Sequence, residues 1–281
     1  GIRVLITAYG VPDTILRISE FGGKDRNEAQ DYDLKQNVFN YAFDTGTTAT
    51  NYISSSFEAN NNFGNASPSS VQFRFKSAGI PTASANIASS DIRYSQSLFI
   101  AGQGDSAIVL EYTGSGFVTG SYSGSVASPY DTYGTLKFIP DTTDVGVSAS
   151  IYLPFFNEDW WSVQVNIDEN TPSATLYAAN EIGGKIGFSG SNQVTSFDIS
   201  YWQDAAKGSL NTNSDFTPGG AGGTYQPFSG SFQELRYWNV ELSESKFFDY
   251  TVNPYSNEGN TINSTPDELF FRAALGTQLN T

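Results

Sequence analysis

The acidic side chains are the first residues to consider for chemistry, because two carboxyl groups that face each other can cleave a glycosidic bond. Glu158 and Asp159 are adjacent in the sequence, so on a strand they would point to opposite faces. Glu234 lies apart from other acids and has Arg236 two positions further on. On a strand these two side chains share a face, where an ion pair is the favoured interpretation. The sequence therefore predicts no pair of catalytic carboxylates and no enzyme.

Nucleophilic and metal chemistry is limited by the residue types that are missing. The chain of 281 residues contains no Cys and no His. Disulfides, Cys or His metal ligands and a Ser-His-Asp relay are thereby excluded. No cofactor is expected, with an oxygen-ligated cation such as calcium as the one exception to consider.

One loop resembles the beginning of a calcium site. In "NTNSD", residues 211–215, amide and carboxylate side chains alternate as at the start of an EF-hand loop. The sixth position is Phe216 rather than Gly, and the twelfth is Gly222 rather than Glu. An EF-hand is therefore excluded, and a solvated loop is the favoured interpretation of these residues.

Aromatic residues next to predicted loops are the candidates for binding a sugar, since an aromatic ring offers an apolar face and, in Tyr and Trp, a polar edge. Tyr130, Tyr133 and Trp202 have such positions, and Asp204 follows Trp202 closely. For Trp202 the sequence leaves ligand binding and packing equally open, because Trp is rarely buried completely. The other three Trp residues are expected to pack in the core or at a sheet edge: Trp160, Trp161 and Trp238.

The charge balance excludes two classes of partner. Asp and Glu number 29 against 14 Lys and Arg, which gives a formal net charge of −15. A nucleic-acid-binding protein needs a basic face, and an anionic membrane surface makes the same demand. No apolar run has the length of a membrane span. We therefore expect neither nucleic acid binding nor membrane insertion.

Period-two alternation of apolar and polar residues predicts strands throughout the middle of the chain. It is clearest at residues 71–76, "VQFRFK", where one face should be in water, at 159–168, "DWWSVQVNID", and at 195–202, "TSFDISYW". Residues 95–112, "SQSLFIAGQGDSAIVLEY", predict a hairpin that turns at "GQGD". Many short strands without long helices between them indicate an antiparallel sandwich or barrel.

The alternation also predicts which side chains are buried. Phe232 and Leu235 are both expected in the core, although their spacing requires a bulge in the strand. The complete set of predicted core residues is Phe73, Phe75, Val163, Val165, Phe197, Ile199, Phe232 and Leu235.

The stretch "GSFQELRYWNVELSES", Gly230–Ser245, is similar to the closing signature of laminin-G-like and concanavalin A-like domains. Three earlier stretches fit this family in the same order: "FRFK", the hairpin at 95–112, and "NEDWWSVQV", in which a strand opens with Trp after a polar turn. The resemblance covers about residues 57–250. It implies an all-β, two-sheet antiparallel jelly-roll sandwich with one short helix near the C-terminal end and flanking strands.

Further expectations follow from this resemblance. The short helix should be capped by Ser243, end before Asn253–Pro254 and pack Leu242, Phe247 and Phe248 on the sheet edge. Family members often hold calcium at the rim of the sandwich, which makes Asp204 and Asp215 the calcium candidates.

The C-terminal segment carries a second resemblance. Residues 253–279, "NPYSNEGNTINSTPDELFFRAALGTQL", are similar to segments that connect lectin-like modules in large virion proteins of tailed bacterial viruses. We therefore divide the chain into N-terminal strands with a lead-in loop (1–56), the sandwich (57–252) and a tail or the start of a neighbouring domain (253–281). "DELFFRAAL", residues 267–275, would be a strand of that neighbour or a clamp onto Gly1–Phe21.

Three functions remain open at this point. The resemblance favours a non-catalytic lectin-like module at a virion surface or in another extracellular assembly, serving glycan adhesion or structural spacing. The second is a purely structural module whose partners are other protein chains, as a homo-oligomer or among virion neighbours, with no sugar site. A polysaccharide-degrading glycoside hydrolase ranks last, because its expected Glu-x-Asp-x-x-Glu pattern is absent.

Overall fold

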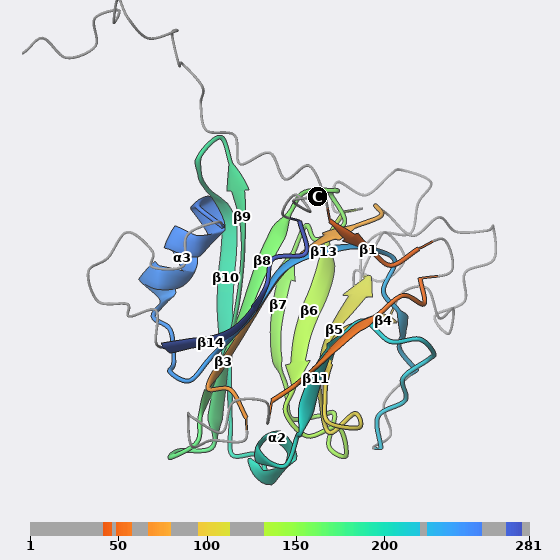
Figure 1. Cartoon of the computed structure of the whole chain (residues 1–281), viewed down its shortest axis with the longest axis vertical. Coiled ribbons are helices and arrows are strands. Elements are labelled where there is room, and N and C mark those ends of the chain that lie inside the picture. The colour runs from red at the N-terminus through yellow and green to blue at the C-terminus, as the bar shows by residue number, and fades with distance from the viewer. Residues whose placement is uncertain are drawn as a thin grey trace, which may run out of the picture. The chain divides into compact units, whose positions relative to one another are not determined.

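The computed structural model of the chain describes residues 42–46, 49–57, 67–79, 95–112, 132–219, 224–254 and 268–276. Within these residues the chain forms two β-sheets and two short helices (Figure 1). The helices are α2 (Ser200–Gln203) and α3 (Glu244–Val252).

One sheet, which we call sheet A, has the strand order β1-β13-β3-β8-β9-β10, and β14 also pairs with β13. Its strands are β1 (Phe43–Asp44), β3 (Ser70–Ser77), β8 (Trp161–Asp168), β9 (Ser173–Ile182), β10 (Lys185–Thr195), β13 (Gly230–Trp238) and β14 (Leu269–Ala273).

The other sheet, sheet B, has the strand order β2-β11-β4-β5-β6-β7, and β12 also pairs with β4. Its strands are β2 (Ile53–Ser56), β4 (Ser95–Ala101), β5 (Ser106–Tyr112), β6 (Gly134–Ile139), β7 (Ala149–Leu153), β11 (Lys207–Leu210) and β12 (Gln226–Pro227). Neighbouring strands in both sheets are antiparallel, apart from the two-residue strand β12, which is parallel to β4. The predicted jelly-roll sandwich is confirmed.

The hydrophobic core lies between the sheets. Val71, Phe73 and Phe75 of β3 and Val163 and Val165 of β8 have no exposed surface. Burying one such side chain stabilises the fold by roughly 1.5–3 kcal/mol. The predicted core set is confirmed except for Ile199, which is only half-buried.

The outer face of sheet A differs from the water-exposed face that the alternation predicts. Gln72 and Arg74 on this face are buried. Next to them on β8, the side-chain amides of Gln164 and Asn166 both donate to the carbonyl oxygen of Leu242, at 3.3 and 2.6 Å. The segment that leads into α3 therefore covers a row of polar side chains and accepts their hydrogen bonds.

Helix α3 begins and ends where the sequence predicts. The hydroxyl oxygen of Ser243 accepts a hydrogen bond from the backbone N–H of Lys246 at 3.3 Å, which satisfies a donor that the first helical turn leaves unpaired. The helix ends at Val252, before Asn253.

The packing of α3 follows the prediction in part. Leu242 and Phe247 are buried as predicted, and the ring centroids of Phe247 and Tyr177 of β9 are 5.8 Å apart. Tyr250 is buried against Trp238 of β13 at 5.5 Å. Phe248 is only half-buried, because residues three apart on a helix share a face and Phe248 does not share that of Phe247 and Tyr250.

Residues 195–202 are not the strand that their alternation predicts. β10 ends at Thr195, Ser196 has a left-handed backbone with φ +65°, and α2 begins at Ser200. The carboxylate of Asp198 accepts hydrogen bonds from the Ser200 hydroxyl (2.7 Å) and the Ser200 N–H (3.0 Å), which lower the pKa of Asp198. This local turn competes with the extended conformation, as short polar side chains often do.

Strands on both sides of residues 57–252 contribute to the sandwich. β1 and β2 precede residue 57, and β14 follows residue 252. β14 pairs with β13, so that Leu235 lies opposite Ala273. It is therefore not a strand of a neighbouring domain, while the alternative clamp onto residues 1–21 involves residues outside the described ranges.

Asn211 connects three segments that are distant in the sequence. Its buried side-chain amide donates to the carbonyl oxygens of Ala49 (2.7 Å) and Asn51 (2.8 Å), and its side-chain oxygen accepts from the N–H of Phe228 (2.7 Å). Its φ is +62°, a backbone conformation that Asn tolerates better than most residues. Asn211 thus links the end of β11 to the segments that precede β2 and β13.

A bulge in β13 places both Phe232 and Leu235 in the core. The register of β13 against β3 shifts between Gln233 and Arg236, and Glu234 has a φ of +55°. Phe232 and Leu235 are then both completely buried, which confirms the predicted bulge. The turn of the backbone directs the Glu234 carboxylate to the same side as Arg236.

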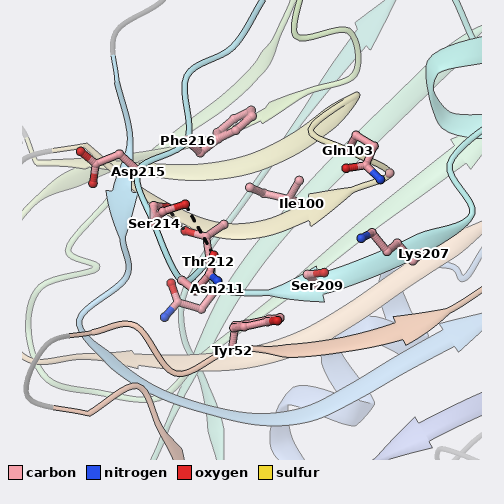
Figure 2. Close-up of a pocket in the computed structure, with 12 residues that line it drawn as sticks. Tyr52, Ile100, Gln103, Lys207, Ser209, Asn211, Thr212, Ser214, Asp215 and Phe216 are labelled. Carbon is pink, nitrogen blue, oxygen red and sulfur yellow. Dashed lines mark hydrogen bonds between the residues drawn. The ribbon is translucent and has the colours of Figure 1, made fainter.

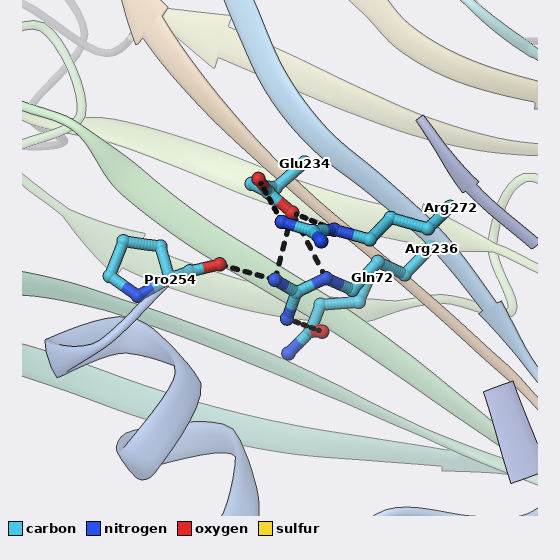
Figure 3. Close-up of polar contacts among 5 residues, drawn as sticks. All are labelled: Gln72, Glu234, Arg236, Pro254 and Arg272. Atoms are coloured by element: carbon cyan, nitrogen blue, oxygen red, sulfur yellow. Dashed lines mark hydrogen bonds and ion pairs between the residues drawn. The ribbon is translucent and has the colours of Figure 1, made fainter. Parts of the chain in front are cut away.

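The Glu234 carboxylate is the centre of a buried ion-pair cluster (Figure 3). It accepts two hydrogen bonds from Arg236 (3.1 and 2.8 Å) and two from Arg272 of β14 (both 2.9 Å). Arg236 also donates to the Pro254 carbonyl oxygen and lies over the Tyr250 ring, 5.0 Å from its centroid. Burial lowers the pKa of Arg236, and the Glu234 carboxylate opposes this shift. The predicted pairing of Glu234 with Arg236 is confirmed.

We predict that Glu234→Gln strongly destabilises the sandwich, because it leaves Arg236 buried without a counter-charge. The expected loss is about 3–5 kcal/mol in the free energy of unfolding, measured by urea denaturation. Glu244→Gln is the control: Glu244 is exposed in the first turn of α3, where its charge contributes less than about 1 kcal/mol. Equal losses in the two variants would contradict a structural role for the cluster.

We also predict that Asn211→Ala costs about 2–4 kcal/mol in the free energy of unfolding. The change removes three hydrogen bonds and leaves the buried N–H of Phe228 without this partner. Asn213→Ala, at an exposed position in the same loop, should change stability by no more than about 0.5 kcal/mol. If both substitutions have the same small effect, Asn211 does not join the three segments in solution.

Candidate functional site

A groove crosses the face of sheet B that points away from the core. Its volume is about 340 Å³, at the lower end of the roughly 300–1,000 Å³ typical of small-molecule sites. The residue before β2, the β4–β5 hairpin, β11 and the loop after β11 supply its lining: Tyr52, Ile100, Gly102, Gln103, Lys207, Ser209, Asn211, Thr212, Asn213, Ser214, Asp215 and Phe216.

Two aromatic side chains form opposite walls of the groove. Tyr52 and Phe216 lie on its two sides, with Ile100 between them (Figure 2). Tyr52 is 50% exposed, whereas Ile100 is 8% exposed. At the floor, Ser209 donates to the hydroxyl of Ser54 on β2 at 3.0 Å. Small side chains at these two positions leave the space between the aromatic rings open.

Phe216 is held in place by Tyr225. Their backbones exchange two hydrogen bonds of 2.7 Å, and their ring centroids are 6.2 Å apart. Tyr225 packs on Val109 and Ile139 of sheet B. Gly104 lies under the Phe216 ring, since a Cβ at Gly104 would be 2.6 Å from Phe216 Cε2. The wall of the groove therefore rests on a small hydrophobic cluster of its own.

A hydrogen bond fixes the hydroxyl end of the Tyr225 side chain. Its hydroxyl donates to Glu111 at 3.3 Å, and Glu111 pairs with Lys137 at 2.7 Å. Burial raises the pKa of Tyr225, and the negative charge of Glu111 raises it further. The hydroxyl therefore stays protonated at neutral pH and remains a hydrogen-bond donor.

Several polar side chains in the groove have no partner among the described residues. The side chains of Tyr52, Gln103, Lys207 and Asp215 make no hydrogen bond or ion pair within the part of the chain that the structure describes. These groups can bind a ligand without first breaking an internal contact. The groove thus combines aromatic walls with polar groups of both kinds, donors and acceptors.

The charges of the groove do not suit acid–base hydrolysis. Among its lining residues Asp215 is the one carboxylate and Lys207 the one basic group. Glycoside hydrolysis by general acid catalysis requires two carboxyl groups. Glu158 and Asp159 lie in the turn before β8 rather than on a strand, and Asp159 accepts a hydrogen bond from Asn157 at 2.7 Å.

Trp202, a predicted ligand-binding residue, is buried and cannot stack on a sugar. It is 1% exposed, and its indole N–H donates to the Pro68 carbonyl oxygen at 2.9 Å. Its ring packs against Phe57 and Phe138, with centroids 6.1 and 6.0 Å away. Helix α2 turns this side chain into the core. A strand over residues 195–202 would instead have ended at Trp202, near the rim of the sandwich.

The two predicted tyrosines lie apart from the groove or outside the described residues. Tyr133 is half-buried, and its ring centroid is 5.1 Å from that of Tyr152 on the edge strand β7. Tyr130 lies outside the described residues. Tyr133 does not line the groove.

The two calcium candidates are not brought together in the groove. Asp215 lines it, whereas Asp204 is the exposed C-cap residue of α2 and does not. No group of three or more acidic residues in the described ranges could hold a metal ion. Calcium binding at the rim stays a prediction.

Sequence reasoning missed both aromatic walls. Tyr52 and Phe216 come from segments far apart in the chain, and their approach depends on the pairing of β2 with β11. The sequence feature that could have indicated the groove is the presence of small residues in two paired strands, "ISSS" in β2 and "KGSL" in β11. Such small residues on paired strands leave an uncovered sheet face.

A second hollow of about 380 Å³ lies at the ends of β1, β3 and β13. It contains Asp44, Glu158 and Lys76 and is lined by no aromatic residue. Asp44 accepts a hydrogen bond from the N–H of Gly46 at 2.6 Å and so stabilises its own turn. The groove on sheet B is the better candidate, because it has aromatic faces.

Within the described ranges, no helix has both the length and the apolar composition needed to span a membrane.

No protein-family model matches the chain, and no curated protein is significantly similar to it. Several solved structures are similar at low identity. The CBM40 domain of the Ruminococcus gnavus IT-sialidase is 12% identical with a TM-score of 0.36, over 66% of this chain and 83% of that one. The native heptameric SAP-like pentraxin from Limulus polyphemus is 13% identical with a TM-score of 0.38, over 76% and 86%.

Domains LG4–5 of the mouse laminin α1 chain are 11% identical with a TM-score of 0.38, over 72% of this chain and 42% of that one. None of these three is a virion protein, so the predicted origin in a bacterial virus gains no support from them. With such TM-scores and identities, the similarities identify no family and no ligand. The assignment of a function therefore rests on the residues of this chain alone.

Proposed function

We propose that this chain is a non-catalytic saccharide-binding module and that its ligand lies in the groove on sheet B. The observation that carries the proposal is the pair of aromatic walls, Tyr52 and Phe216, with Ile100 and Ser209 between them. A sugar ring has apolar C–H faces and a periphery of hydroxyl groups. The rings would contact the faces, and the side chains of Gln103 and Asp215, which have no partner among the described residues, would bind hydroxyls.

The solvent exposure of the groove fits an extended ligand better than an enclosed small molecule. Tyr52, Gln103, Asn213 and Asp215 are all exposed, so a bound sugar unit could continue into further units on either side. Small-molecule sites, in contrast, bury about 70–90% of their ligand. A segment of an oligosaccharide is therefore the proposed occupant.

The wider role that we propose is attachment of a larger extracellular or virion assembly to glycans. The support for it is the resemblance of Gly230–Ser245 to laminin-G-like and concanavalin A-like domains, and that of residues 253–279 to segments between lectin-like modules of virion proteins. The alternative is a structural module that binds other copies or other chains and no sugar. Its supporting observation is the exposed edge strand β10, where Phe188 is 41% exposed.

We predict that Tyr52→Ala weakens oligosaccharide binding about tenfold, equivalent to about 1.4 kcal/mol, because the ligand loses one aromatic face. A glycan array would select the oligosaccharide, and titration calorimetry would measure its affinity. Tyr152→Ala is the matched control, since Tyr152 is also an exposed tyrosine of sheet B, 45% exposed, but lies on β7 away from the groove.

Two results would contradict this proposal. If no glycan on the array binds, the structural alternative is favoured; if Tyr52→Ala and Tyr152→Ala weaken binding equally, the groove is not the site. Product analysis of the bound oligosaccharide should reveal no new reducing ends. Their release would contradict the absence of catalysis.

A further inference from the structure

The charges in the groove identify the kind of saccharide that fits it, an inference that rests on the proposed function. Lys207 is the one cationic side chain of the lining and forms no ion pair among the described residues. Acidic residues outnumber basic ones by 29 to 14 in the chain, so an unpaired Lys beside an open groove is unusual here. Its ammonium group is available to an anionic ligand.

The backbone of Lys207 is fixed at the end of the groove. Lys207 is the first residue of β11, lies opposite Ser56 of β2 and accepts a hydrogen bond from the N–H of Gly102 at 2.8 Å. Gln103, whose side-chain amide is a second donor, lies at the same end (Figure 2). The adjacent acid, Asp105, accepts a hydrogen bond from the Gln103 N–H at 3.0 Å and forms no ion pair with Lys207.

The opposite end of the groove carries the opposite charge. Figure 2 shows Asp215 and Lys207 at its two ends, with Ile100 between them. A carboxylate at Asp215 repels an acidic group and accepts hydrogen bonds from hydroxyls. The two ends therefore orient a ligand that is acidic on one unit and neutral on the next.

We infer that the groove binds an acidic oligosaccharide, with the anionic group of one sugar unit at Lys207 and Gln103 and a neutral unit beside Asp215. The anionic group is a carboxylate or a sulfate, since a Lys ammonium acts on both as a point charge. A densely charged polyanion does not fit, because the protein's own negative charge repels it. The preferred polymer carries isolated acidic units between neutral ones.

The experiment compares three oligosaccharides of equal length: one with a single uronic acid unit, its sulfated equivalent and its neutral equivalent. Titration calorimetry at low salt should show an acidic ligand binding about fivefold more tightly than the neutral one. The preference should fall as salt is raised. Lys207→Gln should abolish the preference for the acidic ligands, and Asp215→Asn should strengthen binding of the acidic ligand.

Lys185→Gln is the matched control. Lys185 is the exposed first residue of β10, outside the groove, so its replacement should leave the preference unaltered. Equal affinities for the three ligands, with binding still weakened by Tyr52→Ala, would overturn this inference and leave the saccharide-binding function intact. A preference that survives Lys207→Gln would also overturn it. If none of the three binds while another glycan on the array does, the inference fails and the saccharide-binding function stands. A uronate-only or sulfate-only preference supports the inference and identifies the anion.

Discussion

The bulge at Glu234 is the local distortion on which the C-terminal part of the sandwich depends. A regular strand would place either Phe232 or Leu235 in the core, but not both, and the left-handed residue between them resolves this conflict. The same distortion places a carboxylate where Arg236 and Arg272 converge on it. A buried ion pair seldom stabilises a fold more than apolar packing would. Its value here is specificity, because it fixes the register of β14 and the end of α3 together.

The two outer faces of the sandwich have different surroundings. On sheet A, the segment before α3 accepts hydrogen bonds from the amides of Gln164 and Asn166, so this part of the face is satisfied by the chain itself. On sheet B, the hydrophobic cluster around Tyr225 covers part of the face and supports Phe216 at its margin. The groove lies beside this cluster, over Ile100 of β4 and Ser209 of β11.

The fold could be predicted in two steps: alternation indicated an antiparallel sandwich or barrel, and the resemblance of Gly230–Ser245 to laminin-G-like domains indicated the jelly roll. Alternation predicted the core strands, and Ser243 followed by a helical pattern predicted α3. The prediction failed at Trp202, where Asp198 starts a turn that alternation alone does not reveal. It failed again for the groove, because Tyr52 and Phe216 come to line the same groove only through the pairing of distant strands. One residue of the groove did stand out in the sequence: Asp215 was named there, as a candidate ligand of calcium.

Ser54 and Ser209 are positions at which the size of the groove can change without disturbing the hydrophobic core. Their hydroxyls bond to each other across β2 and β11 on the outer face of the sheet, while Phe99 and Tyr237 fill the space beneath Gly208 on the inner face. Larger side chains at the two serines would divide the groove without entering the hydrophobic core. Relatives of this chain could therefore change the size of the groove at little cost in stability, and a protein engineer could do the same.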